Sequence, residues 1–308
     1  MYFPISGVEC NPLLPPLVAF TIASAVTSAG VSGAFLILPF QMSVLGFTSP
    51  AVSATNLLYN IVAIPGGVSQ YIREGRMAWP IAMTTLVGTL PGIFIGAVIR
   101  VRYMPDAHSA RGFVGLVLLW LGWRILSEWF RRVTGRSEAR DTIAARFRGR
   151  LPSEARVRTR SISWCRVDYD FWGETFHFST PGLLALSLAV GIAGGIYGIG
   201  GGAIIAPFIV SVMHLPVYTI AGASLFGTFI TSIVGVGFFE YLSRLPVAEG
   251  LTVRPDWMLG ALFGVGGLAG THVGARLQKY LPDLWIRLLL GVIVTGLAAR
   301  YLWQFLVG

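Results

Sequence analysis

Hydrophobic residues run in long stretches along this chain, separated by polar connections. A helix needs about 20 apolar residues, rising 1.5 Å each, to cross the hydrocarbon core of a bilayer. Apolar segments of this kind lie in two sets of four, one set on each side of a central polar stretch: Leu13–Gly46, Pro50–Ile72, Trp79–Val101, Gly112–Phe130, Pro181–Met213, Val217–Leu242, Trp257–Leu277 and Leu284–Val307. The pattern predicts an all-α polytopic membrane protein.

Two of these segments are too long for a single crossing. Leu13–Gly46 and Pro181–Met213 each exceed thirty residues. A straight helix of that length spans about 50 Å, against a hydrocarbon core of about 30 Å. Each segment contains glycines followed by a proline, and irregular backbone survives at membrane depth only inside protein or beside water. We therefore expect each to be broken at its glycine-rich motif, as two half-helices or a re-entrant excursion.

The two sets of segments resemble each other in sequence. Residues 30–40 align with residues 198–208 at a constant offset of 168 (207 − 39). Further matches continue in the same order, with an offset that drifts by about ten residues: Leu57 with Leu225, Trp79 with Trp257, Gly88 with Gly266, Gly92 with Gly270, Gly96 with Gly274 and Arg124 with Arg300. We predict two homologous four-segment transmembrane repeats, residues 1–130 and 181–308, inverted rather than parallel, as in many transporters.

The central stretch, residues 131–180, is predicted to be a basic cytoplasmic loop. Half of the arginines lie between Arg131 and Arg166, and basic loops stay on the cytoplasmic side of a membrane. Residues 162–169 alternate loosely between apolar and polar side chains, and Phe171–Glu174 would turn the chain back into residues 175–178. This pattern favours a small β-hairpin within the loop.

Composition and charge exclude a soluble protein. The chain has 308 residues, of which 54% are hydrophobic and 12% charged, whereas a soluble domain carries about 25% charged residues. Its mean hydropathy is +0.70. A net charge of +9 could suggest nucleic acid, but the basic residues gather in the central stretch or flank apolar segments. We expect the lipid bilayer as a partner and no nucleic acid.

The sequence offers no catalytic or metal-binding constellation. Cys10 and Cys165 lie outside the apolar segments with no metal-ligand spacing, so we predict neither a disulfide nor a metal site. The Gly198-x-Gly200 pair follows no strand, and no acidic residue comes about twenty residues later, so a dinucleotide fold fails. The N-terminus lacks the positive region of a cleaved signal peptide. We expect no enzyme and no cofactor.

The glycine motifs are the first candidate binding elements. The second motif contains Gly198, Gly200, Gly201 and Gly202, and the first is a degenerate copy with Gly30, Ser32 and Gly33. Glycine lets a ligand approach the backbone closely, and the free N–H groups at a half-helix N-terminus attract anions. The alternative is close helix packing through small residues. Recurrence in both halves, next to the excess length, favours a substrate-binding site.

Polar side chains on the following segment are the second candidate element. Ser53, Asn56 and Asn60 follow the spacing of one helix face, and Thr55 adjoins them. Neutral donors suit an anion that must be held and released. The alternative is interhelical hydrogen bonding, which contributes only about 0.6 kcal/mol on average in membranes. The matching positions in the second half are Ser224 and Thr228. We assign these residues to substrate binding: Thr55, Asn56, Asn60, Ser224 and Thr228.

Four ionisable residues are candidates for the transport pathway or for coupling. Arg124 and Arg300 occupy equivalent places in the fourth and eighth segments, where they could attract anions at a pathway mouth or simply extend to the interface. Glu240 and His272 could couple transport to protons. The alternatives are that Glu240 lies at a helix end and that His272 is a structural histidine.

The chain resembles the sulfite exporter TauE/SafE family. The opening Phe3–Gly7 followed by Asn11–Leu14 resembles the start of many bacterial members. So does the paired Gly-x-Gly-Gly-Gly…Pro pattern, although the first copy departs from it at Ser32 and Ala34. The resemblance covers essentially the whole chain. It implies a carrier of the bacterial inner membrane that exports sulfite, sulfoacetate or other organosulfonates without ATP.

The sequence thus predicts a secondary transporter that exports a small anion, most simply sulfite or an organosulfonate such as sulfoacetate, by alternating access between the two halves. An uptake carrier or a channel for another small anion is the first alternative. A non-transporting membrane scaffold, with the arginine-rich loop as its binding surface, is the second. A homodimer stays open as the oligomeric state.

Overall fold

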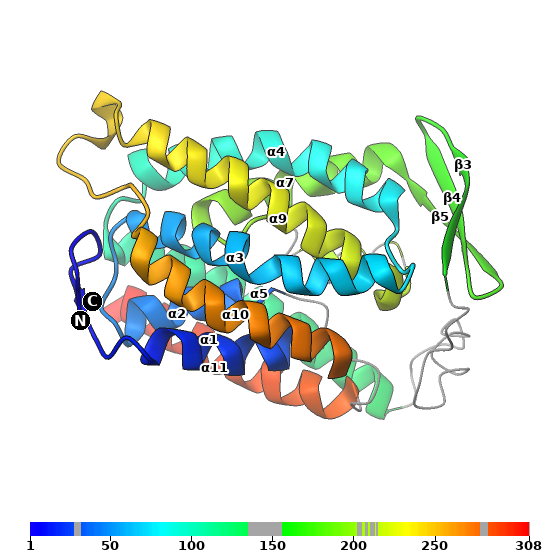
Figure 1. Cartoon of the computed structure of the whole chain (residues 1–308), viewed down its shortest axis with the longest axis horizontal. Helices are drawn as coiled ribbons and strands as arrows, with labels where there is room; N and C mark the ends of the chain where they lie inside the picture. Colours follow the sequence, from blue (N-terminus) through cyan, green and yellow to red (C-terminus); the bar gives the residue numbers. More distant parts are fainter. Residues whose placement is uncertain are drawn as a thin grey trace.

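Figure 1 shows the chain as a computed structural model, which describes residues 1–27, 32–134, 156–201, 205–206, 209, 213, 215–277 and 283–307. Helices make up most of it. The elements are β1 (Tyr2–Phe3), β2 (Val8–Glu9), α1 (Leu14–Thr27), α2 (Ala34–Ser43), α3 (Ala51–Arg73), α4 (Trp79–Arg102), α5 (Ala107–Val133), β3 (Val157–Ile162), β4 (Arg166–Phe171), β5 (Glu174–Ser179), α7 (Thr180–Tyr197), α9 (Val217–Leu242), η1 (Pro246–Ala248), α10 (Trp257–Leu277) and α11 (Asp283–Val307).

The helices are those of a membrane protein. Within the described ranges, six are long and apolar enough to cross a bilayer: Ala51–Arg73, Trp79–Arg102, His108–Arg131, Thr180–Tyr197, Thr219–Leu242 and Trp257–Leu277. Large apolar side chains such as Leu116 and Val265 are 60% exposed on them, which suits contact with lipid and would be costly in water. The predicted all-α polytopic architecture is confirmed at this level.

Both long segments contain a break, and at each break the chain turns back. The first consists of α1 and α2, and it starts and finishes at the end of the bundle that holds both termini (Figure 1), called here the terminal end. There Ala51 N–H donates to the carbonyl of Thr252. The second segment begins with α7, which ends at Tyr197. Its start near Gly182 lies within van der Waals range of Met213, so this segment turns back toward the opposite end.

A small three-stranded sheet lies beyond the helices at that opposite end, called here the sheet end (Figure 1). The strands are antiparallel in the order β3-β4-β5. Trp172 and Gly173 join β4 to β5 with φ of 51° and 82°, the left-handed backbone of a tight hairpin turn. The predicted hairpin is confirmed, and β3 adds a third strand that we did not predict. The Tyr169 hydroxyl lies 3.0 Å from Thr219 Oγ1 and ties the sheet to α9.

Three glycines on α4 and three on α10 allow two pairs of helices, α4 with α7 and α10 with α1, to pack closely. A Cβ added to the glycines of α4 would come within 3 Å of α7 carbonyl oxygens, and one added to those of α10 within 3 Å of α1 carbonyl oxygens. The contacts are Gly88 with Leu184, Gly92 with Leu188, Gly96 with Ile192, Gly266 with Pro16, Gly270 with Phe20 and Gly274 with Ser24. Small residues at such seams let backbones approach in membranes.

The seam between α4 and α7 gives a prediction about stability. Gly92→Ala would place a methyl group 2.6 Å from the Leu188 carbonyl oxygen, and overpacking of this kind costs about 1–3 kcal/mol. Gly237→Ala is the matched control, because nothing lies within 4 Å of a Cβ there. We expect Gly92→Ala to lower the melting temperature in detergent and Gly237→Ala to leave it unchanged or raise it slightly. Equal melting temperatures would contradict the close packing at this seam.

Helices α5 and α11 pack mainly on each other, and α2 lies between this pair and the other helices. All of α2 is buried except Phe40 and Ser43. Tyr301 of α11 donates its hydroxyl hydrogen to the Pro39 carbonyl at 2.9 Å and accepts one from Ser43 at 2.7 Å. Helix α2 is therefore enclosed by protein.

Candidate functional site

The two broken segments meet at the centre of the molecule, and Asn56 of α3 joins them. Its Nδ2 donates to the Ala34 carbonyl in the first turn of α2 and to the Gly198 carbonyl that follows α7, both at 2.9 Å. The side chain is fully buried. One amide group thus connects backbone from the first segment to backbone from the second, and we call this meeting point the central crossing.

Asn60 lies one helical turn further on and makes a second connection. Its Nδ2 donates to the Ile199 carbonyl at 2.9 Å, and its Oδ1 accepts a hydrogen bond from Ser32 Oγ at 2.7 Å. Ser32 Oγ in turn accepts from the Ala34 backbone N–H at 3.3 Å. Three of the four amide hydrogens that we expected to contact an anion are therefore bound to backbone carbonyls in this conformation. Both asparagines hold the central crossing together.

Two further contacts reinforce the crossing. Ser53 Oγ donates to the Ile196 carbonyl at 3.2 Å, and the Tyr197 hydroxyl donates to the Phe35 carbonyl at 2.8 Å. The end of α7 is thereby attached to α3 on one side and to α2 on the other.

The backbone angles and the close neighbours of the second motif require glycine there. Gly198 and Gly200 have φ of 75° and 69°, a backbone region that residues with a Cβ rarely adopt. A Cβ on Gly200 would lie 2.8 Å from Thr228 Cγ2, and one on Gly201 would lie 2.8 Å from Thr89 Cβ. The motif therefore lies directly against α9 and α4. Gly30 and Gly202 lie outside the described residues.

Buried hydroxyl groups without hydrogen-bond partners surround the crossing. On α9, Ser224, Thr228 and Ser232 share one face, being four residues apart. The Oγ atoms of Ser224 and Ser232 have no hydrogen-bond partner among the described residues, while Thr228 Oγ1 donates to the Ser224 carbonyl at 2.9 Å. On α3, the buried Tyr59 hydroxyl is also unpaired and would lie 2.6 Å from a Cβ on Gly33. Buried polar groups normally have partners, so these three donors are available to a ligand.

Sequence reasoning missed Tyr59, Ser232 and Thr89. Ser232 continues the four-residue spacing of Ser224 and Thr228, so periodicity alone could have found it. Thr89 on α4 packs its methyl group against Gly201, and Tyr59 lies against Gly33. Neither contact leaves a signal in the chain, because each joins a helix to an irregular stretch of backbone that sequence periodicity cannot place.

Several residues singled out from the sequence lie away from the crossing. Thr55 Oγ1 accepts a hydrogen bond from the Asp256 backbone N–H at 2.8 Å, so it supports the start of α10. Glu240 forms ion pairs with Arg244 at 3.6 Å and Arg254 at 3.4 Å. It lies near the end of α9, in agreement with the alternative that it is a helix-end residue. The remaining three lie on outer helices, with Arg124 and His272 half-buried and Arg300 exposed.

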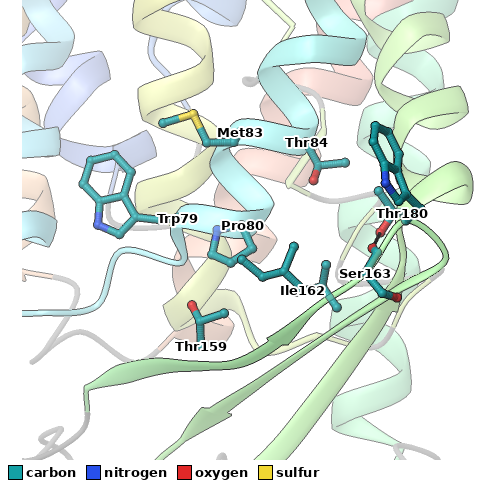
Figure 2. A pocket seen from close by; sticks show the side chains of 10 residues that line it. Trp79, Pro80, Met83, Thr84, Thr159, Ile162, Ser163 and Thr180 are labelled. Carbon is teal, nitrogen blue, oxygen red and sulfur yellow. Dashed lines mark hydrogen bonds between the residues drawn. The ribbon is translucent and has the colours of Figure 1, made fainter.

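A large groove lies at the sheet end, remote from the crossing. Figure 2 shows it between the first turns of α4 and the sheet, and its volume is about 560 Å³. Mainly apolar side chains line it, among them Trp79, Met83, Ile162 and Trp164, of which Trp164 is 90% exposed. Exposed tryptophans are typical of the membrane interface. In the part of the chain that the structure describes, no three His, Cys, Asp or Glu side chains group to hold a metal ion.

Comparison with known proteins gives the family. The family model for the sulfite exporter TauE/SafE matches residues 16–301. The chain belongs to the sulfite exporter TauE/SafE family. A probable membrane transporter protein of Xylella fastidiosa (strain Temecula1) is 24% identical over 287 residues, covering 92% of each chain. The probable membrane transporter protein YunE of Bacillus subtilis (strain 168) is 20% identical over 298 residues, covering 94% of this chain and 95% of its own. No solved structure matches the chain.

Membership of the TauE/SafE family agrees with the architecture. The match covers both broken segments and the central crossing between them. The family and these relatives are membrane transporters, and the described helices are those of a multi-pass membrane protein. The chain is therefore a membrane transporter of the TauE/SafE type, with a small-molecule substrate and a lipid bilayer as its surroundings, as in a bacterial inner membrane.

Proposed function

We propose that this transporter is a secondary carrier that exports a small anion, sulfite or an organosulfonate such as sulfoacetate, through the central crossing. The observation that carries the proposal is the meeting of two broken segments beside buried hydroxyls that have no partner. Unpaired polar groups are costly in a low-dielectric interior. A bound substrate that accepts hydrogen bonds from Tyr59, Ser224 and Ser232 would remove that cost.

The chemistry of the crossing favours an anion over a cation. Helix α2 begins at Ala34, next to Ser32 and Gly33, so the positive end of its dipole faces the crossing. The unpaired hydroxyls can donate hydrogen bonds. The described side chains that form the crossing include no carboxylate. Donors and a helix N-terminus without acidic groups suit the oxygen atoms of a sulfite or sulfonate group.

We further infer that the two halves, residues 1–130 and 181–308, are inverted repeats. The seam carbonyls at Pro16, Phe20 and Ser24 precede those at Leu184, Leu188 and Ile192 by 168 residues in every case (184 − 16, 188 − 20, 192 − 24). That offset equals the one between the glycine motifs. The paired helices α3 and α9 run in opposite directions between the terminal and sheet ends (Figure 1), which supports inversion. Alternating access would then rock one half against the other.

Orientation follows from the basic sheet and loop. Arg158, Arg160 and Arg166 are exposed on the sheet, and basic residues near membrane spans stay in the cytoplasm. The sheet end would then face the cytoplasm and the terminal end the outside. An inside-negative potential favours exit of an anion by about 2.3 kcal/mol per charge per 100 mV. Export in this direction would need no coupling ion.

Flux in proteoliposomes tests the proposed function. Purified protein is reconstituted, a potassium-diffusion potential is imposed, and uptake of labelled sulfite, sulfoacetate and sulfate is followed. We expect saturable, potential-driven flux of sulfite or sulfoacetate, absent from protein-free vesicles. Flux that rises linearly with concentration would indicate a channel. If no anion moves, we would abandon the carrier in favour of the scaffold, and deleting residues 140–158 should then abolish the cellular function.

A further inference from the structure

Arg100 is a buried cation near the terminal end of α4, and in the described part of the chain no acidic group pairs with it. Its side chain is 2% exposed. Nη2 donates to the Thr48 carbonyl at 3.3 Å, whereas the buried Nη1 has no hydrogen-bond partner. Among the described residues no carboxylate lies within the 4 Å that defines an ion pair with it. Nothing in the sequence distinguishes Arg100, because it falls at the end of an apolar segment.

The burial of Arg100 is unusual beside that of the other arginines. Arg76 is equally buried, at 3% exposure, but forms an ion pair with Glu74. Arginines near the end of a spanning helix usually extend to the interface, which an exposure of 2% rules out for Arg100. Removing a charge from water without a partner costs several kcal/mol even after relaxation. An external anion would supply the missing charge.

Asp106 lies in the connection from α4 to α5. Its carboxylate is the acidic group that affects Arg100 electrostatically, without touching the guanidinium. It is exposed, and the Ser109 hydroxyl and backbone N–H donate to its two carboxylate oxygens at 2.6 and 2.9 Å. These hydrogen bonds hold the pKa of Asp106 below its ordinary value. The Asp106 carboxylate is thus ionised, but its hydrogen bonds go to Ser109. It makes no contact with the Arg100 guanidinium.

A small cavity connects Arg100 with the central crossing. Its volume is about 10 Å³, enough for roughly one water molecule. Ser53 and Tyr197, which both belong to the crossing, line it together with Arg100. On the other side it is closed by Ala110, Phe113 and Val114 of α5, the helix that packs mainly on α11. The Arg100 guanidinium therefore lies next to the central crossing, on the side that faces the terminal end.

We propose that Arg100 forms a second anion-binding site, on the terminal side of the central crossing, for small oxyanions such as sulfite. This proposal rests on the proposed function and adds a step to it. A guanidinium can donate two parallel hydrogen bonds to two oxygens of one anion. The cavity holds only about one water molecule here, so an oxyanion enters when α5 moves away from α4. The site receives the anion from the crossing before its release at the terminal end.

Two measurements on purified protein test the site, namely equilibrium binding of labelled sulfite in detergent and flux in proteoliposomes. The variants are Arg100→Gln and Arg100→Lys. Arg102→Gln is the matched control, because Arg102 lies two residues away and is exposed. Hydrogen bonds to charged groups contribute enough for us to expect a loss of sulfite affinity of about tenfold or more in Arg100→Gln. Arg100→Lys should lose less, and Arg102→Gln nothing.

The outcomes separate this proposal from the proposed function. Wild-type binding of sulfite that Arg100→Gln weakens supports the site even if no flux is seen, in which case the carrier proposal alone fails. Saturable wild-type flux with unchanged affinity and rate in Arg100→Gln would overturn the site and leave the carrier intact. If Arg100→Gln does not fold, Arg100→Lys decides, since a lysine cannot reproduce the two-pronged contact. A sulfite affinity of Arg100→Lys equal to that of the wild type and of Arg102→Gln would then refute the site.

Discussion

Replacing Asn56 with leucine is expected to abolish transport and to lower stability, more than any other single change on α3. The substitution keeps the volume of the side chain but removes both donors that connect Ala34 in α2 with Gly198 after α7. Among the described residues, no other donor reaches the Gly198 carbonyl. Leaving a buried carbonyl unsatisfied costs about 1–3 kcal/mol, well above the 0.6 kcal/mol typical of a polar contact between membrane helices.

Ser69→Ala on the same helix is the control for Asn56→Leu. Its hydroxyl donates only to the Gly66 carbonyl within α3, at 3.0 Å, so this change should leave flux and melting temperature close to those of the wild type. Flux in proteoliposomes and the melting temperature in detergent are measured for both variants. An Asn56→Leu protein that transports at the wild-type rate would show that the link between the two broken segments is dispensable.

Much of the fold follows from periodicity and length. Apolar segments of about 20 residues predicted the spanning helices, and excess length together with glycine pointed to the two breaks. The hairpin was predictable because Trp172 and Gly173 interrupt alternating residues. Strand β3 was not, since Val157–Ile162 is rich in arginine and reads as a solvated linker. Arginines on a short, exposed strand suit the edge of a sheet, where charge discourages pairing with other chains.

The candidate site was only partly predictable. Helical spacing placed Asn56 and Asn60 on one face, as the structure has them. It could not reveal their partners, because the carbonyls of Gly198 and Ile199 are about 140 residues away and belong to irregular backbone. The spacing of donor groups therefore could not show that these donors bind backbone carbonyls in this conformation, and the assignment of both asparagines to substrate binding stays a prediction. Burial is equally hidden from the sequence, and for that reason Arg100 looked like an ordinary arginine at a helix end.

The role of the glycine motif depends on which donors around it are already hydrogen-bonded and which are unpaired. The asparagines fix the positions of both broken segments, so the backbone at residues 198–201 is held against α9 and α4 without support from a ligand. In the proposed site, a substrate would then meet a preformed surface that offers unpaired hydroxyl donors. Preorganised donors bind a ligand without the cost of ordering it first. Filling that surface should therefore act on transport more than on folding.

Gly201→Leu is the change expected to block transport at this surface. A Cβ at residue 201 already lies 2.8 Å from Thr89 Cβ, and a leucine side chain would extend further into the space between the motif and α4. We expect loss of saturable flux, with a destabilisation of about 1–3 kcal/mol from overpacking. Gly237→Leu is the matched control, because the space around that glycine is open. It should fold and transport as the wild type does.

A compensating pair distinguishes steric blockage from loss of a backbone contact with the substrate. Gly201→Ala should reduce flux by overlapping Thr89, and Thr89→Gly removes all three side-chain atoms that the new methyl group would meet. If overlap with α4 is the whole cause, the double variant regains flux. If the glycine is needed so that the anion can approach the backbone, the double variant stays inactive although its melting temperature recovers. The second result would add the backbone at residue 201 to the hydroxyls of the proposed site, and full recovery of flux would reduce Gly201 to a packing residue.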